Sequence, residues 1–141
     1  MKTAVILASG KGSRLKDILS DRPKGFLQMG GQTLIERSIK LLKKNHVERI
    51  IITTGYQSQY YEELAKNIEG IECIFNPQYA DSGSMYSLFC AKSLINSPFL
   101  LLESDLIFEE KALKELLASP FENAILSSGR THSGDEVFIE R

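Results

Sequence analysis

The sequence predicts an α/β fold of three layers, in which an open and mainly parallel sheet is covered by helices on both faces. Apolar, β-branched runs alternate along the chain with amphipathic stretches of helical period. The first run, Thr3–Ala8, is apolar at every position but the first, as in a strand that is covered on both faces. No internal repeat or linker interrupts the alternation. We therefore expect one Rossmann-like domain over residues 1–141.

Six segments have the composition of strands. The first two are Thr3–Ala8 and Arg49–Thr54, both predicted to be buried, and Gly55 closes the second of them. The other strands are predicted at Ile71–Phe75, Phe99–Ser104, Asn123–Ser128 and Glu136–Glu140. The last segment begins a strand close to the final residue, so we expect a truncated domain whose C-terminal part is missing.

Helices are predicted between these strands. In Thr33–Lys44, apolar side chains recur on one stripe and charged side chains lie mostly opposite. The other helices are predicted at Gln59–Ile68, Ser84–Ile95 and Glu109–Ala118. Ser82 or Ser84 is the expected N-cap of the third helix, and acidic residues in the first turn favour the fourth.

Three loops are expected to meet at one edge of the sheet. In open parallel sheets, ligands bind at the carboxyl ends of the strands, near the point where the strand order reverses. The loops that follow Ala8, Phe75 and Ser104 therefore hold the candidate site.

The loop after the first strand, in the sequence LASGKGSRL, has the composition of a phosphate-binding loop. Gly10 and Gly12 allow backbone N–H groups to turn toward an anion, and Lys11 and Arg14 add positive charge. A tight strand-to-helix turn without a ligand is the alternative interpretation of the two glycines alone.

Two common phosphate motifs do not fit this loop. A Walker A loop requires four residues between its glycines, whereas only Lys11 separates Gly10 and Gly12. The dinucleotide fingerprint requires a third glycine where Leu15 stands, and an acidic residue after the second strand, where threonines stand. A Rossmann-type oxidoreductase is therefore disfavoured.

Separated segments of the chain resemble the nucleotidyltransferases (nucleotide-diphospho-sugar transferase-like), which transfer a nucleoside monophosphate onto a phosphorylated acceptor. These segments are LASGKGSRLKD, RPKGFLQMGGQTLIERSI and LLLESDLIF. In the first block only Ser9 departs from the family pattern, which has alanine there. The resemblance implies two catalytic residues: Arg14, which grips the β- and γ-phosphates, and Lys24, which bridges the reacting phosphorus groups. The nucleotide-binding residues that it implies in the loop are Leu7, Ala8, Ser9, Gly10, Lys11, Gly12 and Ser13.

The resemblance also implies Mg²⁺, which gathers the triphosphate and offsets charge at the α-phosphorus. Asp105, at the end of a predicted buried strand, aligns with the magnesium-binding aspartate of the family. Glu103 is a second candidate, with the positioning of a neighbour as its alternative role. A helix cap or turn is the ordinary interpretation of Asp105 taken alone. The second metal-binding acid of the family would lie beyond Arg141.

The segment Asn76–Ala91 falls where the family places its base-recognition loop. Ser82, Gly83 and Ser84 would let a pyrimidine edge approach backbone and hydroxyl donors. The pattern N-x-x-Y…S-M-Y-S-L resembles the cytidylyltransferase branch that acts on phosphocholine and 2-aminoethylphosphonate, which implies CTP. A core helix capped by serine is the alternative interpretation.

Acceptors of this branch carry an amine or a quaternary ammonium group, which aromatic faces and carboxylates hold. Tyr86, Asp135 and Glu136 are the acceptor-binding residues that we predict, and Tyr79 and Asp81 offer the same chemistry. Burial in the core is the alternative for Tyr86.

The predicted activity is a magnesium-dependent transfer of CMP from CTP to a small amine-bearing phosphonate or phosphate, with release of pyrophosphate. A sugar-1-phosphate nucleotidyltransferase and a non-catalytic nucleotide-binding module are the alternatives, and a fragment of this kind can itself be inactive. A net charge of −1 gives no sign of a polyanion-binding surface and the apolar runs are too short for a bilayer, so no nucleic-acid or membrane partner is expected. Cys73 and Cys90 have no CxxC spacing and are expected to be buried, reduced thiols, which predicts a cytoplasmic location. A fused enzyme domain could follow, and the oligomeric state stays open.

Overall fold

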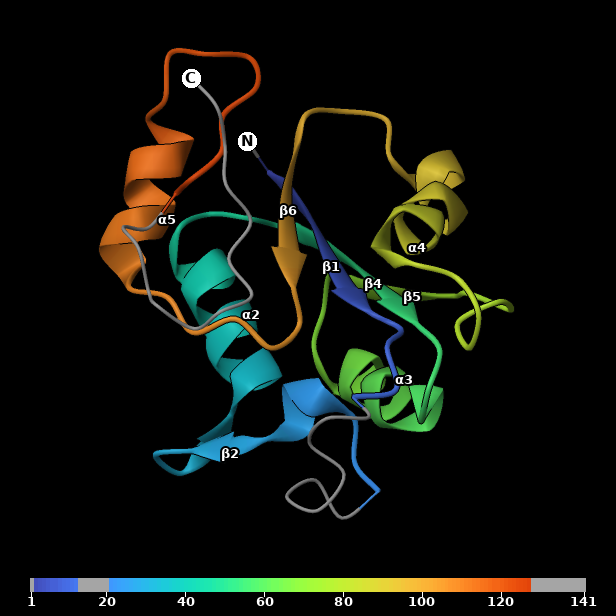
Figure 1. Cartoon of the computed structure of the whole chain (residues 1–141). Coiled ribbons are helices and arrows are strands. Elements are labelled where there is room, and N and C mark those ends of the chain that lie inside the picture. Colours follow the sequence, from blue (N-terminus) through green and yellow to red (C-terminus); the bar gives the residue numbers. More distant parts are fainter. Residues whose placement is uncertain (1, 13–20, 128–141) are drawn as a thin grey trace. The chain divides into compact units, whose positions relative to one another are not determined.

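The computed structural model describes residues 2–12 and 21–127 (Figure 1). The chain forms two compact units, residues 1–107 and 108–141. The first unit contains four parallel strands: β1 (Thr3–Ala8), β4 (Arg49–Thr54), β5 (Ile71–Phe75) and β6 (Phe99–Glu103). Because they lie in the order β5-β4-β1-β6, the strand order reverses between β1 and β6. This reversal is the place where open α/β sheets bind ligands.

Helices lie on both sides of this sheet, which confirms the three-layer α/β prediction. Figure 1 shows α4 (Ser84–Cys90) on one side and α2 (Leu34–Lys44) on the other. On the α4 side, Val5, Leu7 and Ile51 form a buried cluster with Ala91 and with side chains of α4 and its C-terminal turn. Among the described residues of this unit, the remaining α-helix is α3 (Ser58–Asn67), which packs mainly on β5.

The predicted helix at residues 84–95 is shorter than expected and is capped differently. It ends at Cys90, and a 3₁₀ turn, η3 (Lys92–Leu94), follows. Its N-cap is Gly83 instead of Ser82 or Ser84. Both serine hydroxyls bond elsewhere, because Ser82 Oγ accepts a hydrogen bond from Asn76 and Ser84 Oγ donates one to Glu103.

The strand predicted at Asn123–Ser128 is wrong for the residues that the structure describes. Residues 123–127 are exposed and have no strand assignment. The apolar pattern alone does not make a strand, because a strand forms only when its backbone groups pair with a neighbour. The helix predicted beside it is present in the second unit as α5 (Glu110–Leu117). The strand predicted at Glu136–Glu140 lies outside the described residues.

A short hairpin precedes α2. Its strands are β2 (Gln28–Met29) and β3 (Gln32–Thr33), and its turn residues Gly30 and Gly31 have φ values of 59° and 84°. Positive φ at both central residues is typical of the type I′ turns that join hairpin strands. The hairpin leads directly into Thr33, the N-cap of α2.

Thr33 and Glu36 form a reciprocal capping box at the start of α2. Glu36 N donates to Thr33 Oγ1 at 3.3 Å, and Thr33 N donates to Glu36 Oε2 at 2.8 Å. The hydrogen bond from the Thr33 backbone is the main cause that lowers the pKa of the Glu36 carboxyl, and the Thr33 hydroxyl adds to it. The charged form of Glu36 is therefore the one that stabilises the helix start.

We expect Thr33→Ala to lower the free energy of unfolding by about 1 kcal/mol near neutral pH. Because the folded-state pKa of Glu36 is lowered, its contribution is present above the ordinary carboxyl pKa and is lost as the pH falls through the folded value. The cost of the substitution should therefore shrink in acid. Urea denaturation at neutral and acidic pH measures both effects. Thr33→Ser, which keeps the hydroxyl, is the control, and an equal loss in both variants would contradict the capping role.

None of the helices within residues 2–12 and 21–127 has the length and apolarity that crossing a membrane requires.

Candidate active site

The candidate site lies at the carboxyl ends of β1 and β6. Leu7 of β1 pairs with Glu103 of β6, and Ser104 N donates a hydrogen bond to the Leu7 carbonyl at 3.0 Å. The chain that leaves β1 at Ser9 and the chain that reaches Asp105 after β6 therefore start at the same level of the sheet. This arrangement brings together two segments that the sequence placed in one site.

The loop after β1 exposes Gly10 and Lys11 and buries Ser9 and Gly12. Gly12 has a φ of 63°, a left-handed conformation that glycine adopts without strain and that helps to turn successive N–H groups toward one concavity. Lys11 Nζ lies 5.9 Å from the centre of the Tyr79 ring. Leu7 and Ala8, also predicted to bind nucleotide, are buried at the end of β1. The predicted residues Ser13 and Arg14 lie outside the described residues.

Lys24 and Asp105 form an ion pair. Lys24 Nζ lies 3.3 Å from Asp105 Oδ2, and the two side chains are 35% and 36% exposed. The structure thus joins the residue predicted to bridge the reacting phosphorus groups to the residue predicted to bind magnesium. With a third of each side chain in contact with solvent, both groups are accessible to a ligand.

Close packing at Gly25 brings Lys24 to this position. Lys24 begins the 3₁₀ turn η2 (Lys24–Phe26), which follows Pro23. A Cβ on Gly25 would lie 2.8 Å from Tyr61 Oη and 3.3 Å from the Ser104 carbonyl oxygen. Only glycine therefore lets η2 lie directly against the loop after β6. Tyr61 is fully buried beneath this contact, and burial raises the pKa of its hydroxyl to about 12.

Glu103 is the second carboxylate at the end of β6. Its Oε1 accepts a hydrogen bond from Ser84 Oγ at 3.2 Å, which links β6 to the first residue of α4. Partial desolvation raises the pKa of the Glu103 carboxyl, and the negative charge of Asp105 acts in the same direction. The hydrogen bond from Ser84 and the charge of Lys24 oppose this rise. The positioning role that we predicted as the alternative for Glu103 agrees with its bond to Ser84.

The donor set fits Mg²⁺ that is held jointly with a ligand. Among residues 2–12 and 21–127, no three His, Cys, Asp or Glu side chains gather into a cage for a metal. Mg²⁺ does not need one, because it usually keeps several waters and binds through one or two carboxylates together with substrate phosphates. Asp105 supplies such a carboxylate two residues after β6, the strand that pairs with β1, and Glu103 is the last residue of β6.

The segment after β5 forms the third side of the site. Asn76 is completely buried, and its Nδ2 donates to Ser82 Oγ and to Ser87 Oγ, both at 3.0 Å. Its Oδ1 accepts from Gln78 N at 2.8 Å, which fixes the turn. Asn76 and Ser87 belong to the predicted base-recognition segment and its pattern N-x-x-Y…S-M-Y-S-L, but neither was predicted to have a role of its own. The Asn76-Pro77 sequence could have indicated the role of Asn76 in this turn, because asparagine side chains often accept a hydrogen bond from the backbone N–H two residues later.

The predicted base-recognition residues differ in accessibility. Gly83 and Ser84 are exposed, and Ser82 is half-buried beside Asn76. A Cβ on Gly83 would meet no atom within 4 Å, so the backbone there is open to a ligand.

The predicted acceptor residues are only partly described. Tyr86 of α4 is half-buried, and its ring centre lies 5.9 Å from that of Phe89. The ring of Tyr79 packs edge-on against Phe75 and lies below Lys11, and Asp81 is exposed. Asp135 and Glu136 lie outside the described residues.

The loops after β1, β4 and β5 meet at Gly55. A Cβ on Gly55 would overlap with Cβ of Tyr79 and would lie 2.7 Å from the Ser9 carbonyl oxygen. Tyr56 N donates to that same oxygen at 3.1 Å. The absence of a side chain at Gly55 therefore sets the distance between the glycine-rich loop and the segment after β5, a role that the local sequence pattern does not indicate.

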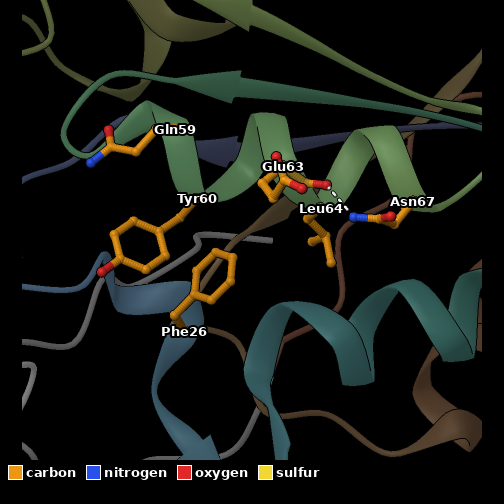
Figure 2. A pocket seen from close by; sticks show the side chains of 6 residues that line it. All are labelled: Phe26, Gln59, Tyr60, Glu63, Leu64 and Asn67. Carbon is orange, nitrogen blue, oxygen red and sulfur yellow. Dashed lines mark hydrogen bonds between the residues drawn. The ribbon is translucent and has the colours of Figure 1, made fainter.

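An apolar pocket of about 320 Å³ lies elsewhere, between η2 and α3 (Figure 2). Figure 2 shows Phe26 of η2 and Tyr60 of α3 extending toward each other, and their ring centres are 5.2 Å apart. The residues that line it are Phe26, Gln59, Tyr60, Glu63, Leu64 and Asn67. This lining contains no cationic side chain and no residue of the glycine-rich loop, so the pocket is not suited to a triphosphate.

Residues 4–134 match the MobA-like NTP transferase domain. The choline-phosphate cytidylyltransferase of Streptococcus pneumoniae is 31% identical over 118 residues, which cover 84% of this chain and 51% of that protein. The bifunctional protein GlmU of Methanococcus maripaludis is 36% identical over 122 residues, which cover 86% of this chain and 28% of that protein. The inositol-1-phosphate CTP transferase of T. maritima has the same fold, with a TM-score of 0.72 and 32% identity over 82% of this chain and 48% of that one. The chain thus spans between about a quarter and about half of the length of these relatives.

Proposed function

Because this chain belongs to the MobA-like NTP transferase domain family, we propose that it provides the nucleotide-binding and metal-binding part of a cytidylyltransferase. The reaction is the transfer of CMP from CTP to a small phosphorylated or phosphonate acceptor, with release of pyrophosphate. The observation that carries this proposal is the Lys24–Asp105 pair, which lies beside the glycine-rich loop at the reversal of the strand order.

The proposed reaction is a direct displacement at phosphorus. An acceptor oxygen attacks the α-phosphorus of CTP, a new P–O bond forms, and the bond to the bridging oxygen breaks, so that pyrophosphate leaves with the electron pair. The backbone N–H groups of Gly10–Ser13 and the Arg14 side chain hold the triphosphate. Lys24 lies close enough to Asp105 to bring positive charge to the reacting groups. No covalent enzyme intermediate is needed.

Magnesium fits this site through Asp105, with Glu103 positioning the neighbouring backbone and α4. When bound, it supplies charge neutralisation for the triphosphate as negative charge builds up on the leaving pyrophosphate. The residues of this chain then orient CTP. Asp105 lies in the turn after β6 and Lys24 in the 3₁₀ turn η2, so the site contains one charge of each sign.

Cytidine is favoured over other bases on two grounds. Two of the relatives are, by name, a cytidylyltransferase and a CTP transferase. In this chain, the exposed backbone at Gly83 and the hydroxyls of Ser82 and Ser84 offer a pyrimidine edge small, polar surroundings. For the acceptor, we keep the amine-bearing class, with Tyr86, Asp135 and Glu136 as its predicted contacts.

The test is pyrophosphate release with CTP, UTP and ATP against phosphocholine, 2-aminoethylphosphonate and a sugar 1-phosphate. We expect release with CTP and Mg²⁺ and an amine-bearing acceptor. Release only with UTP and the sugar phosphate would replace the proposal with a sugar-1-phosphate nucleotidyltransferase. If no protein that contains this chain releases pyrophosphate, the remaining interpretation is a non-catalytic nucleotide-binding module.

Removing the metal gives a second prediction. Chelation of Mg²⁺ with EDTA should weaken CTP binding by about tenfold or more, since the triphosphate then faces Asp105 without a neutralising cation. Isothermal titration of the chain with CTP, with and without EDTA, measures this. Asp105→Asn should bind CTP with much less dependence on the metal. Equal affinity of the unmodified chain in both conditions would support the non-catalytic module.

A further inference from the structure

A buried hydrogen-bonded chain connects the glycine-rich loop to the segment after β5. Ser9 Oγ and Ser87 Oγ lie 2.5 Å apart, and Asn76 Nδ2 donates to Ser87 Oγ at 3.0 Å. The three residues are 8%, 1% and 0% exposed. They come from the end of β1, from α4 and from the end of β5, so this chain of bonds joins three separate segments of the site.

The donors and acceptors in this chain have a definite order. The Asn76 side-chain nitrogen can only donate, and its two protons go to Ser82 and to Ser87. Ser87 therefore accepts from Asn76. Within the described part of the chain, the Ser87 hydroxyl has one other hydrogen-bond partner, Ser9 Oγ. Either serine can donate in this contact; we assign Ser87 as the donor because it is 1% exposed and an unpaired buried hydroxyl is costly, whereas Ser9 is 8% exposed.

This order leaves the hydroxyl proton of Ser9 available. Ser9 retains a small exposed surface where the chain leaves β1 and enters the glycine-rich loop. Its backbone is held from the other side, since the Ser9 carbonyl accepts from Tyr56 N at 3.1 Å. The Ser87 contact and the Tyr56 contact therefore hold the side chain and the backbone of Ser9, and with Ser87 as donor the Ser9 hydroxyl proton is not used in this chain of bonds.

We propose that Ser9 donates a hydrogen bond to the nucleoside part of the bound nucleotide, and that Ser87 and Asn76 are positioning residues that orient it. The inference rests on the proposed function. Asn76 also holds Ser82, so the same side chain fixes the predicted base-recognition segment. A ligand that spans the loop and this segment depends on the connection between them, whereas a bare triphosphate depends on the loop alone.

The test compares two ligands, CTP and inorganic tripolyphosphate, both with Mg²⁺. Isothermal titration is carried out on the unmodified chain, on Ser9→Ala, on Ser87→Ala and on the double variant. We expect each single variant to bind CTP about threefold to tenfold more weakly, the effect of one hydrogen bond. Affinity for tripolyphosphate should stay within about twofold. The double variant should bind CTP no more weakly than the weaker-binding single variant, because each single substitution already breaks the same chain of hydrogen bonds.

Ser38→Ala is the matched control. Ser38 is a buried serine of α2, and its hydroxyl has no hydrogen-bond partner among the described residues. It should leave the affinities for both ligands unchanged. The thermal midpoint of each variant reports on folding, and Ser9→Ala keeps the test valid if Ser87→Ala unfolds.

Three results would overturn the inference. Equal weakening of CTP and tripolyphosphate binding would show that Ser9 only supports the loop. If the unmodified chain binds CTP and Ser9→Ala binds it equally well, the proposed hydrogen bond to the nucleoside is contradicted, while the proposed function is unaffected. Failure of the unmodified chain to bind either ligand would overturn the proposed function, and the inference with it.

Discussion

Replacing Lys24 with alanine is expected to lower the rate of pyrophosphate release by on the order of a hundredfold or more. The reason is the position of its ammonium group, 3.3 Å from Asp105 and beside the loop that is proposed to hold the triphosphate. Charge in this place opposes the repulsion between two anionic reactants and stabilises the transition state. CTP affinity should fall much less than the rate, because the backbone N–H groups of the loop remain.

The same substitution should change stability little. The pair is about one-third exposed, and exposed ion pairs contribute about 0–1 kcal/mol to the free energy of unfolding. Steady-state assays and chemical denaturation separate the two effects. Lys66→Ala is the matched control, since Lys66 forms an exposed ion pair with Glu63 at 3.2 Å on α3. A Lys24→Ala enzyme with normal turnover would reject the catalytic assignment.

Gly55→Ala is expected to have the largest effect on stability, a loss of roughly 1–3 kcal/mol in the free energy of unfolding. The new methyl group would overlap with Tyr79 and would lie 2.7 Å from the Ser9 carbonyl oxygen. One of these neighbours is backbone, which moves only if the loop moves. The variant should therefore bind CTP more weakly even where it is still folded.

Gly10→Ala is the control for Gly55→Ala. A Cβ on Gly10 would meet no atom within 4 Å, so its methyl group causes no steric conflict. Urea denaturation should give Gly10→Ala nearly the stability of the unmodified chain. Equal stability of Gly55→Ala and the unmodified chain would contradict the close packing at Gly55.

The sequence predicted those parts of the fold and site that depend on local patterns. The apolar runs at Thr3–Ala8 and Arg49–Thr54 are strands of the sheet, because continuous burial on two faces leaves a distinct composition. Lys24 and Asp105 were selected from motifs, and the structure brings them together. Their roles in catalysis stay predictions.

Other features could not be predicted, because they depend on distant contacts. Asn76 and Ser87 are hydrogen-bonded to each other, and Ser87 also contacts Ser9. Ser9 and Ser87 are 78 residues apart in the sequence, so no local pattern indicates this contact. Gly25 is special because it lies against Tyr61 and the Ser104 backbone.

The incorrect strand at residues 123–127 has the same origin. Its apolar residues match the composition of a strand, but that local composition does not show whether a neighbouring strand is present to pair with it.

The place of β6 in the sheet also has a consequence for folding. β6 pairs with β1 in the register Thr3↔Phe99, so about 95 residues must be enclosed before this ladder closes. Such long-range parallel pairings form slowly. Within this sheet, the neighbours β1, β4 and β5 also follow one another along the chain, and they can associate earlier. Asp105 therefore reaches Lys24 only when this final pairing is made, and a partly folded chain would lack the complete binding site.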